Sequence, residues 1–338
     1  MPVKNRLTWA TMRAIVIREA GGPEVLEEAR RPIPEPGPGE IRVRVHAVGL
    51  NRADLIQRRG HYPAPPGVPA DVPGLEYAGV VDATGAGAGR WSVGARVMGI
   101  VGGGAYAEYV VVHEDEALAV PSPLSLEEAA AVPEAYLTAH DALFTQLGLR
   151  RGERVLVHAV GSGVGTAALQ LAHAAGAHVF GTSRSAWKLE RATALGLELA
   201  IDTSREDFAE VVRERTDGHG VDVILDLVGA GFLAGNLRAL ATRGRMAVVG
   251  LVAGSRAELD LGLLLRKRIT IVGTVMRSRS LEEKIQVARA FAETALPLFE
   301  TGRLRPVLGE TITPDDIRDA HRRMEENRTF GKIVMVWG

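Results

Sequence analysis

Residues 154–165 read RVLVHAVGSGVG, and this stretch decides the fold. Residues 154–158 form a short, mostly apolar run, which predicts a buried parallel strand. A glycine-rich turn follows, and from Val164 apolar residues recur at helical spacing until Gly176 ends the segment. In such a turn, free backbone N–H groups and the positive end of the helix dipole point at the bound group. The stretch therefore predicts a cradle for the diphosphate of a dinucleotide.

The spacing of the turn departs from the strict G-x-G-x-x-G fingerprint of dinucleotide sites. Counting back from Gly165, Ser162 and Val160 stand where that fingerprint has its other two glycines. A purely structural turn is the alternative interpretation. The flanking strand, the flanking helix and the residues about 20 positions later favour the dinucleotide.

The next predicted strand, residues 177–182, bears on the choice of cofactor. It is followed by Ser183 and Arg184 and, one helical turn later, by Lys188. A site for NAD normally places an Asp or Glu here for the ribose hydroxyls, but no acidic residue occurs before Glu190. Hydroxyls and cations suit a 2′-phosphate, so we predict NADPH. The alternative is a solvated helix start.

Composition narrows the class of protein. The 338 residues include 40 Lys and Arg against 41 Asp and Glu, for a net charge of −1, and they contain no basic block. We therefore expect neither nucleic acid nor an anionic membrane as a partner. No apolar run reaches the length of a membrane span and the N-terminus lacks a signal-peptide core, so we expect a cytoplasmic protein. Cysteine is absent, which excludes disulfides, thiolate nucleophiles and cysteine-containing zinc sites.

The order of patterns predicts two domains. Residues 1–11 look like an N-terminal extension, and residues 12–130 contain many short strands between Gly and Pro turns, as in a partly closed β-barrel. Over residues 131–273 strands and helices alternate, which predicts a doubly wound parallel sheet. Residues 274–338 carry two amphipathic helices and a last strand. We expect them to fold back onto the barrel, so that this domain is discontinuous.

Residues 269–275, ITIVGTV, are a candidate last strand of the parallel sheet. An exposed edge strand of this kind promotes aggregation unless it is covered, and pairing with its own copy across a two-fold axis covers it. We therefore predict a homodimer joined by this edge. The alternative is an edge covered by the segment after Met276.

Six short motifs occur together along the chain. They are GGPEVL (21–26), NRAD (51–54), GLEYAG (74–79), YAEY (106–109), LTA (137–139) and GKIV (331–334). From Met12 onward the chain resembles the zinc-independent medium-chain dehydrogenases/reductases of the quinone oxidoreductase (zeta-crystallin) family. The stretches AVGSGVG (159–165), RSR (277–279) and MEEN (324–327) further resemble the tumour-suppressor-inducible branch of that family, in which the serine of the turn replaces the commoner glycine.

The resemblance implies a fold and a set of site residues. The fold is an α/β architecture in which a Rossmann-type doubly wound parallel sheet is joined to a GroES-like, partly closed β-barrel domain. The implied contacts are Asn51 and Tyr62 beside the nicotinamide and the substrate, Thr138 on the nicotinamide, Ser162, Gly163 and Val164 on the diphosphate, Ser183 and Lys188 on the 2′-phosphate, and Gly250, Leu251 and Asn327 along the rest of the cofactor.

Zinc is not expected. Zinc-dependent relatives carry a histidine before the glutamate of the Gly-x-Glu motif and cysteine ligands elsewhere, whereas this chain has Leu75 and no cysteine. An apolar side chain cannot ligate a metal. Without a Lewis acid to stabilise an alkoxide, alcohol oxidation is disfavoured. Quinones and conjugated enones remain accessible, because their reduction products spread the negative charge.

The leading hypothesis is an NADPH-dependent quinone oxidoreductase. In it, Asn51 donates an amide hydrogen bond near the substrate carbonyl, and Tyr62 forms a cleft wall whose phenol can bond the same carbonyl. A helix cap and plain loop packing are the respective alternatives. The competing enzyme is an NADPH-dependent enone, 2-alkenal or enoyl-thioester reductase. From another class, the chain could be a nucleotide-binding sensor or an RNA-binding protein, although its charge disfavours RNA.

Overall fold

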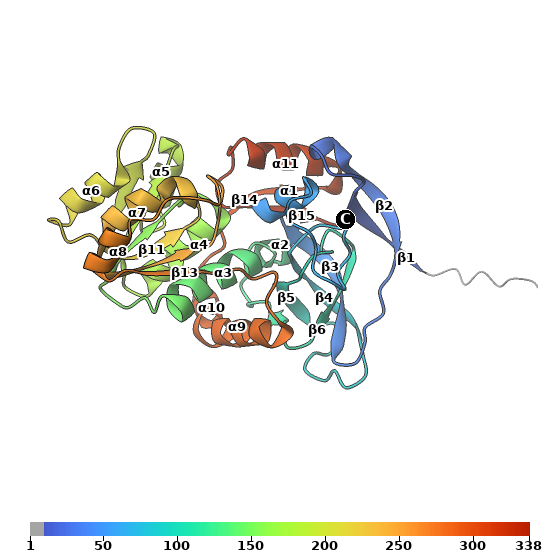
Figure 1. The fold of residues 1–338 in the computed structure, drawn as a ribbon. Helices are drawn as coiled ribbons and strands as arrows, with labels where there is room; N and C mark the ends of the chain where they lie inside the picture. The colour runs from blue at the N-terminus through green and yellow to red at the C-terminus, as the bar shows by residue number, and fades with distance from the viewer. Residues whose placement is uncertain (1–9) are drawn as a thin grey trace, which may run out of the picture. The chain divides into compact units, whose positions relative to one another are not determined.

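The computed structural model describes residues 10–338, so almost all of the predicted extension over 1–11 lies outside the described residues. The chain divides into two compact units. The first contains the described part of Met1–Pro133 together with Glu310–Arg328 and Ile333–Gly338. The second contains Glu134–Gly309 and Thr329–Lys332. Figure 1 shows the ribbon of both units with many of their helices and strands labelled.

The second unit is built on a parallel sheet, as predicted. Within residues 10–338 its strand order is β10-β9-β8-β11-β12-β13, and each neighbouring pair is parallel. The order reverses between β8 and β11, which is the arrangement of a doubly wound sheet. The strands are β8 (Arg154–Val157), β9 (His178–Ser183), β10 (Leu199–Asp202), β11 (Val221–Asp226), β12 (Leu240–Val248) and β13 (Thr270–Gly273).

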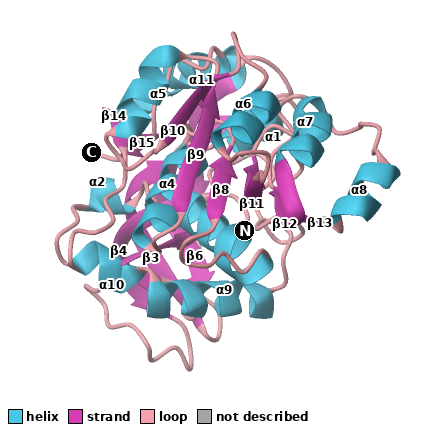
Figure 2. Cartoon of the chain, turned by 90° about the vertical axis from the view of Figure 1, so that its left-hand side faces the viewer, coloured by secondary structure: helices cyan, strands magenta, loops and turns pink. Residues whose placement is uncertain are grey.

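Helices cover both faces of this sheet, because right-handed crossovers place the connecting helices on opposite sides of the reversal point. Figure 2 shows α4 and α5 on one side and α6 and α7 on the other. The face under α6 and α7 buries a cluster around Leu156, Phe208 and Met246. The helices after β8 are α4 (Gly163–Ala174), α5 (Ala186–Thr193), α6 (Phe208–Arg215), α7 (Leu233–Ala239), α8 (Leu261–Lys267), α9 (Leu281–Thr294) and α10 (Leu296–Glu300).

Residues 274–309 group with the sheet unit, not with the barrel to which the sequence assigned them. They pack on the helical segment that opens the unit, which consists of α3 (Thr138–His140) between two π-helical turns, Pro133–Leu137 and Asp141–Gln146. Arg279 pairs with the buried Asp141 at 2.5 Å. The rings of α9 and α10 add edge-on aromatic contacts to this segment.

The first unit is an antiparallel β structure, which agrees with the predicted barrel class. Within residues 10–338, one sheet has the order β14-β15-β3-β4-β5-β7 with β6 beside β3, and β1 pairs with β2 separately. Alternating residues of β3 and β4 point into one apolar core. The strands are β1 (Thr11–Ile17), β2 (Leu26–Pro32), β3 (Glu40–Gly49), β4 (Glu76–Thr84), β5 (Arg96–Ile100), β6 (Tyr109–His113), β7 (Leu118–Ala119), β14 (Leu308–Ile312) and β15 (Lys332–Val336), and the helices are α1 (Arg52–Arg58), α2 (Leu126–Ala129) and α11 (Ile317–Glu325).

A buried polar chain ties α1 to α11 in this unit. Arg58, which has no solvent-exposed surface, donates to Nδ1 of His321 at 3.0 Å and pairs with Glu325. A guanidinium can only donate, so His321 accepts at Nδ1 and carries its proton on Nε2, 3.3 Å from the Tyr106 oxygen. The Tyr106 hydroxyl in turn donates to Asp54 at 3.0 Å. Burial, followed by the positive charge of Arg58, lowers the pKa of His321 to about 3, so this imidazole is neutral.

Among residues 10–338, the structure contains no helix that is both long enough and apolar enough to span a lipid bilayer.

Candidate dinucleotide-binding site

The glycine turn after β8 leads directly into α4. Ser162 is the N-cap of this helix, and its hydroxyl oxygen accepts the Gly165 N–H at 3.0 Å. The N–H groups of Gly163 and Val164 donate to no acceptor within residues 10–338. Two donors at a helix N-terminus, reinforced by the dipole of a 12-residue helix, favour an anion at this position.

Close packing explains the third glycine of the turn. A Cβ on Gly165 would lie 2.4 Å from the Ala159 carbonyl oxygen and 2.8 Å from the Val160 backbone. Ala159 itself has a φ of 48°, so the backbone in front of the helix is tightly folded. The absence of a side chain at Gly165 therefore lets the start of α4 lie against the end of β8.

A segment near the C-terminus completes the turn, and the sequence interpretation missed its role. Gly331 donates its N–H to the Gly161 carbonyl at 3.0 Å. A Cβ on Gly163 would lie 2.5 Å from Cδ of Lys332, whose side chain is buried. The ammonium-bearing chain of Lys332 therefore packs against the free donors of α4. Both residues belong to the motif GKIV (331–334), which contributed to the family resemblance. No contact with the cofactor was predicted for that motif.

Ser183 and Lys188 lie beside the same turn, at the end of β9 and the start of α5. The Ser183 hydroxyl accepts the Ser185 N–H at 3.1 Å. Lys188 packs on the turn, because a Cβ on Gly161 would lie 3.0 Å from the Lys188 Cβ, and its Nζ lies 5.4 Å from the Trp187 ring centroid. The structure therefore brings the residues predicted for the 2′-phosphate close to those predicted for the diphosphate.

The loop after β12 carries Gly250 and Leu251 at the same edge of the sheet. Gly250 donates its N–H to the Asp226 carbonyl at 3.2 Å, and Leu251 is exposed. The buried Asp226 side chain accepts the N–H groups of Val228 and Gly229 at 2.8 and 2.9 Å. These bonds hold the loops after β11 and β12 together.

Behind that loop, the buried His158 has hydrogen-bond partners at both of its ring nitrogens. Its Nε2 lies 2.7 Å from Oδ1 of Asn236, whose amide donates to the Asp226 carboxylate at 3.0 Å. Its Nδ1 lies 2.9 Å from the Thr182 hydroxyl. Burial lowers the pKa of His158, so the neutral ring after β8 bonds to β9 directly and to β11 through the Asn236 side chain of α7.

Thr138, predicted to contact the nicotinamide, lies in α3 of the same unit. Its side chain is buried, yet its hydroxyl has no hydrogen-bond partner within residues 10–338. A buried hydroxyl without a partner is costly and calls for an explanation. A bound polar group would satisfy it.

Asn51, Tyr62 and Asn327 belong to the first unit. The Asn51 side-chain amide donates to Glu76 at 2.9 Å and to the Gly49 carbonyl at 3.2 Å, so both of its N–H groups are used within the protein. Its predicted donation to a substrate carbonyl would require breaking one of these bonds. Its backbone N–H donates to Asp54 at 2.7 Å, as expected of a residue that also caps α1.

Tyr62 is half-buried in the loop after α1. Asn327 follows α11 in the left-handed conformation, with a φ of 56°. Arg52 donates to the Asn327 side-chain oxygen and to the Met324 carbonyl, each at 2.9 Å. Arg52, the residue after Asn51, therefore connects the start of α1 to Asn327 and to the end of α11 within the first unit. Within residues 10–338, no group of three or more His, Asp or Glu side chains is arranged to hold a metal ion.

Known proteins resemble this chain in both of its parts. Residues 163–293 match the model described as "Zinc-binding dehydrogenase", and residues 37–122 match "Alcohol dehydrogenase GroES-like domain". The quinone oxidoreductase of Pseudomonas aeruginosa is 37% identical over 319 residues, which cover 94% of this chain and 97% of the relative. The chain belongs to the quinone oxidoreductase family. It is therefore an oxidoreductase of the medium-chain dehydrogenase/reductase superfamily, whose members use a nicotinamide cofactor.

Solved structures of similar proteins match almost the whole of this chain. The quinone oxidoreductase of Pseudomonas syringae pv. tomato DC3000 has a TM-score of 0.88 and 34% identity, over 96% of this chain and all of that one. An NAD-dependent alcohol dehydrogenase has a TM-score of 0.85 and 38% identity, over 97% of this chain and all of that one. A mycobacterial protein solved with NADPH has a TM-score of 0.85 and 31% identity, over 96% of this chain and all of that one. The relatives thus confirm the quinone oxidoreductase family and the two-part fold.

Proposed function

We propose that this protein is an NADPH-dependent quinone oxidoreductase that transfers hydride without a metal. The observation that carries the proposal is the pair of free N–H groups on Gly163 and Val164, beside Lys188. The name of the Pseudomonas aeruginosa relative supports the quinone, and the mycobacterial neighbour solved with NADPH supports the cofactor.

The residues of the glycine turn fit such a cofactor. Gly163 and Val164 would donate to the diphosphate, and the exposed hydroxyl of Ser162 can donate to it as well. Ser183 and Lys188 would bind the 2′-phosphate. The unpartnered hydroxyl of Thr138 would bond the carboxamide end of the nicotinamide. Gly250, Leu251 and Asn327 are proposed to line the rest of the cofactor.

The bound cofactor supplies a hydride from C4 of its nicotinamide to the quinone ring. The protein then has to orient the two rings and provide a proton to the resulting anion. We propose that the Tyr62 phenol bonds the substrate oxygen. Asn51 positions the start of α1 through its bonds to Glu76 and Asp54.

Steady-state rates with two substrate classes test the reaction. With NADPH as donor, 1,2- and 1,4-quinones are expected to turn over with higher kcat/KM than 2-alkenals of similar size. Turnover of alkenals alone would replace the proposal with enone reduction. No turnover of either class, with the fold intact, would favour a nucleotide-binding sensor.

Replacing Lys188 by alanine is expected to weaken NADPH binding about tenfold, because a charged hydrogen bond to the 2′-phosphate contributes about 1.4 kcal/mol. NADH binding should not change, since that nucleotide lacks the phosphate. Nucleotide fluorescence titrations measure both dissociation constants. Arg150→Ala, at an exposed arginine before β8, serves as the control and should change neither. Equal affinity of the parent protein for the two nucleotides would contradict the assignment.

We further propose that two copies associate through β13. Within residues 10–338 this edge strand pairs with β12 alone, and Figure 2 places it at the end of the sheet with α8 nearby. The neighbouring apolar side chains are exposed, with Leu265 75% and Leu261 65% accessible. Lys267 fixes α8 by donating to three carbonyls at the end of α7 at 2.5 to 2.9 Å. A second copy would cover both the open strand edge and these leucines.

Replacing Leu265 by aspartate is expected to convert the dimer into a monomer, because a charge would have to be buried at the interface. Light scattering after size-exclusion chromatography gives the mass of each species. Val93→Asp places the same charge on another exposed apolar residue, in the first unit, and should leave the dimer intact. A parent protein that is monomeric at micromolar concentration would refute the proposal.

A further inference from the structure

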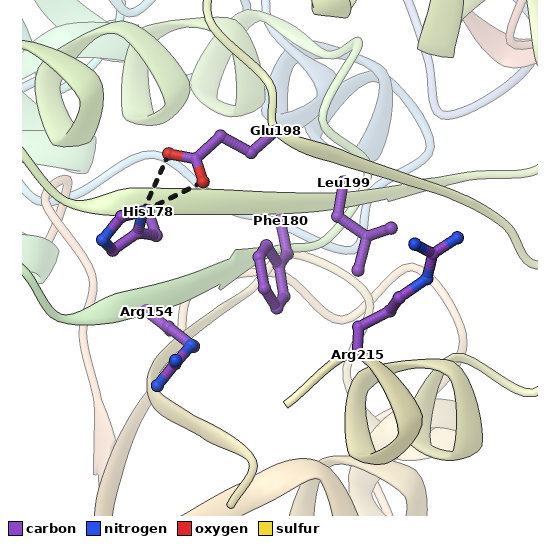
Figure 3. Close-up of a pocket in the computed structure, with 6 residues that line it drawn as sticks. All are labelled: Arg154, His178, Phe180, Glu198, Leu199 and Arg215. Carbon is purple, nitrogen blue, oxygen red and sulfur yellow. Dashed lines mark hydrogen bonds and ion pairs between the residues drawn. The ribbon is translucent and has the colours of Figure 1, made fainter. Parts of the chain in front are cut away.

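A hollow lies in the sheet unit, at the edge opposite the glycine turn. It has a volume of about 310 Å³ and is lined by Arg154, His178, Phe180, Glu198, Leu199 and Arg215 (Figure 3). Three of these residues are the first of their strands β8, β9 and β10, so the hollow lies at the amino ends of the strands. The glycine turn follows the carboxyl end of β8, where cofactors of this fold bind. The hollow is therefore separate from the site proposed above.

Strand register explains why these side chains meet. Arg154 is in register with His178, and Phe180 with Leu199, so all four point to one face of the sheet. The same face is covered by α6, which ends at Arg215. The sheet continues past the end of this helix, and the uncovered part forms the hollow. Phe180 and Leu199 supply its apolar surface.

The charges in the hollow are unbalanced. The Glu198 carboxylate is bonded to the His178 ring at 3.0 and 3.1 Å, and Figure 3 shows the two groups turned toward each other. The guanidinium groups of Arg154 and Arg215 have no hydrogen bond or ion pair with any residue in 10–338, although the Arg154 backbone N–H donates to Asp222. The C-terminal dipole of α6 accounts for a cation at Arg215. It does not account for Arg154, which begins a strand and is half-buried.

We propose that this hollow binds a small organic monoanion with an aromatic body, such as an aryl carboxylate. The carboxylate would take paired hydrogen bonds from a guanidinium, whose planar fork matches its geometry. The ring would cover Phe180 and Leu199, which lie between the two arginines in Figure 3. The volume is at the small end of ligand pockets. Glu198 at the rim disfavours nucleotides and other polyanions, because its charge would repel them.

Calorimetric titration with benzoate tests the site, with and without saturating NADPH. Benzoate is expected to bind in both conditions with the same dissociation constant. Benzamide, which has the same ring without the charge, should bind at least tenfold more weakly. Arg154→Met and Arg215→Met should each weaken benzoate binding at least tenfold. Arg213→Met is the matched control, because Arg213 lies on the same helix but pairs with Glu210, and it should bind benzoate like the parent.

Several outcomes would overturn the proposal. They are absence of benzoate binding by the parent, equal affinity for benzamide, displacement of benzoate by NADPH, and full binding by Arg154→Met. Circular dichroism establishes that each variant is folded, and Arg215→Met decides the question if Arg154→Met is not. The titrations without NADPH and the arginine variants do not depend on the proposed reductase activity, so the two proposals fail separately.

Discussion

Replacing Arg58 by methionine is expected to lower the free energy of unfolding by about 3 kcal/mol. Arg58 is fully buried, and its guanidinium also donates to the Gly21 carbonyl at 3.0 Å. Methionine fills the space of the side-chain stem but leaves that carbonyl and Nδ1 of His321 without their donor, and leaves the Glu325 carboxylate with Arg59 in place of two arginines. Buried acceptors that lose their partner carry the full cost of desolvation. Guanidinium unfolding followed by far-UV circular dichroism measures the change.

The neighbouring arginine gives the control for this experiment. Arg59 pairs with the same Glu325 at 2.6 Å, but its side chain is 51% exposed. Exposed ion pairs contribute little, so Arg59→Met should lower the free energy of unfolding by less than about 1 kcal/mol. Equal effects of the two substitutions would show that the buried chain of polar groups does not hold α1 to α11.

Replacing Gly165 by alanine is expected to abolish measurable binding of the dinucleotide and to destabilise the sheet unit by about 2 kcal/mol. The new Cβ would overlap the Ala159 carbonyl oxygen, which is backbone and cannot rotate away. The start of α4 would have to move from the end of β8. The N–H groups of Gly163 and Val164 would move with it and would no longer both point at the proposed position of the diphosphate.

Fluorescence titration with NADPH, alongside thermal unfolding, measures both effects of Gly165→Ala. Gly89→Ala is the matched control, because a Cβ at Gly89 would meet nothing within 4 Å. It should bind the nucleotide and unfold like the parent. An alanine at position 165 that left the affinity for NADPH unchanged would show that the turn does not grip the cofactor.

The parts of the parallel sheet that depend on short, local sequence patterns were predictable. The apolar run at 154–158 and the glycines after it specify strand, turn and helix without help from the rest of the chain. β10 was not predicted, because it is short and, of its four residues, Ile201 alone is fully buried. α8 was missed for a related reason. Leu261 and Leu265 face solvent and no residue of the helix is fully buried, so no apolar face indicated a helix packed on a core.

The assignment of residues 274–309 shows what an amphipathic pattern leaves open. The pattern of α9 indicates that one face of the helix is buried, but it does not say against which partner. The partner is the segment around His140 and Asp141. Arg279 pairs with Asp141, and the ring of Phe291 contacts the ring of His140. Such a pairing of distant segments cannot be read from either segment alone.

The residues of the candidate site also fall into two groups, those that local sequence predicts and those that meet only through the fold. The turn, Ser183 and Lys188 follow from the end of a strand and the start of a helix, which are local features. Lys332 was missed because it reaches the turn only through the fold. The bonds that the Asn51 amide makes within the protein were not predictable, because its acceptors, Gly49 and Glu76, come from two different strands.

The cover of the glycine turn by residues 329–332 constrains how the protein matures. The ribosome makes residues 161–165 of the turn well before it makes Gly331 and Lys332, which lie far downstream in the chain. The strands of the parallel sheet, which end at Gly273, are therefore all made before the segment that closes the phosphate-binding turn exists. A stop codon shortly before Gly331 would yield a polypeptide with an intact α/β layer. Its phosphate-binding turn would lack the contacts of Gly331 and Lys332 and would bind a phosphate weakly.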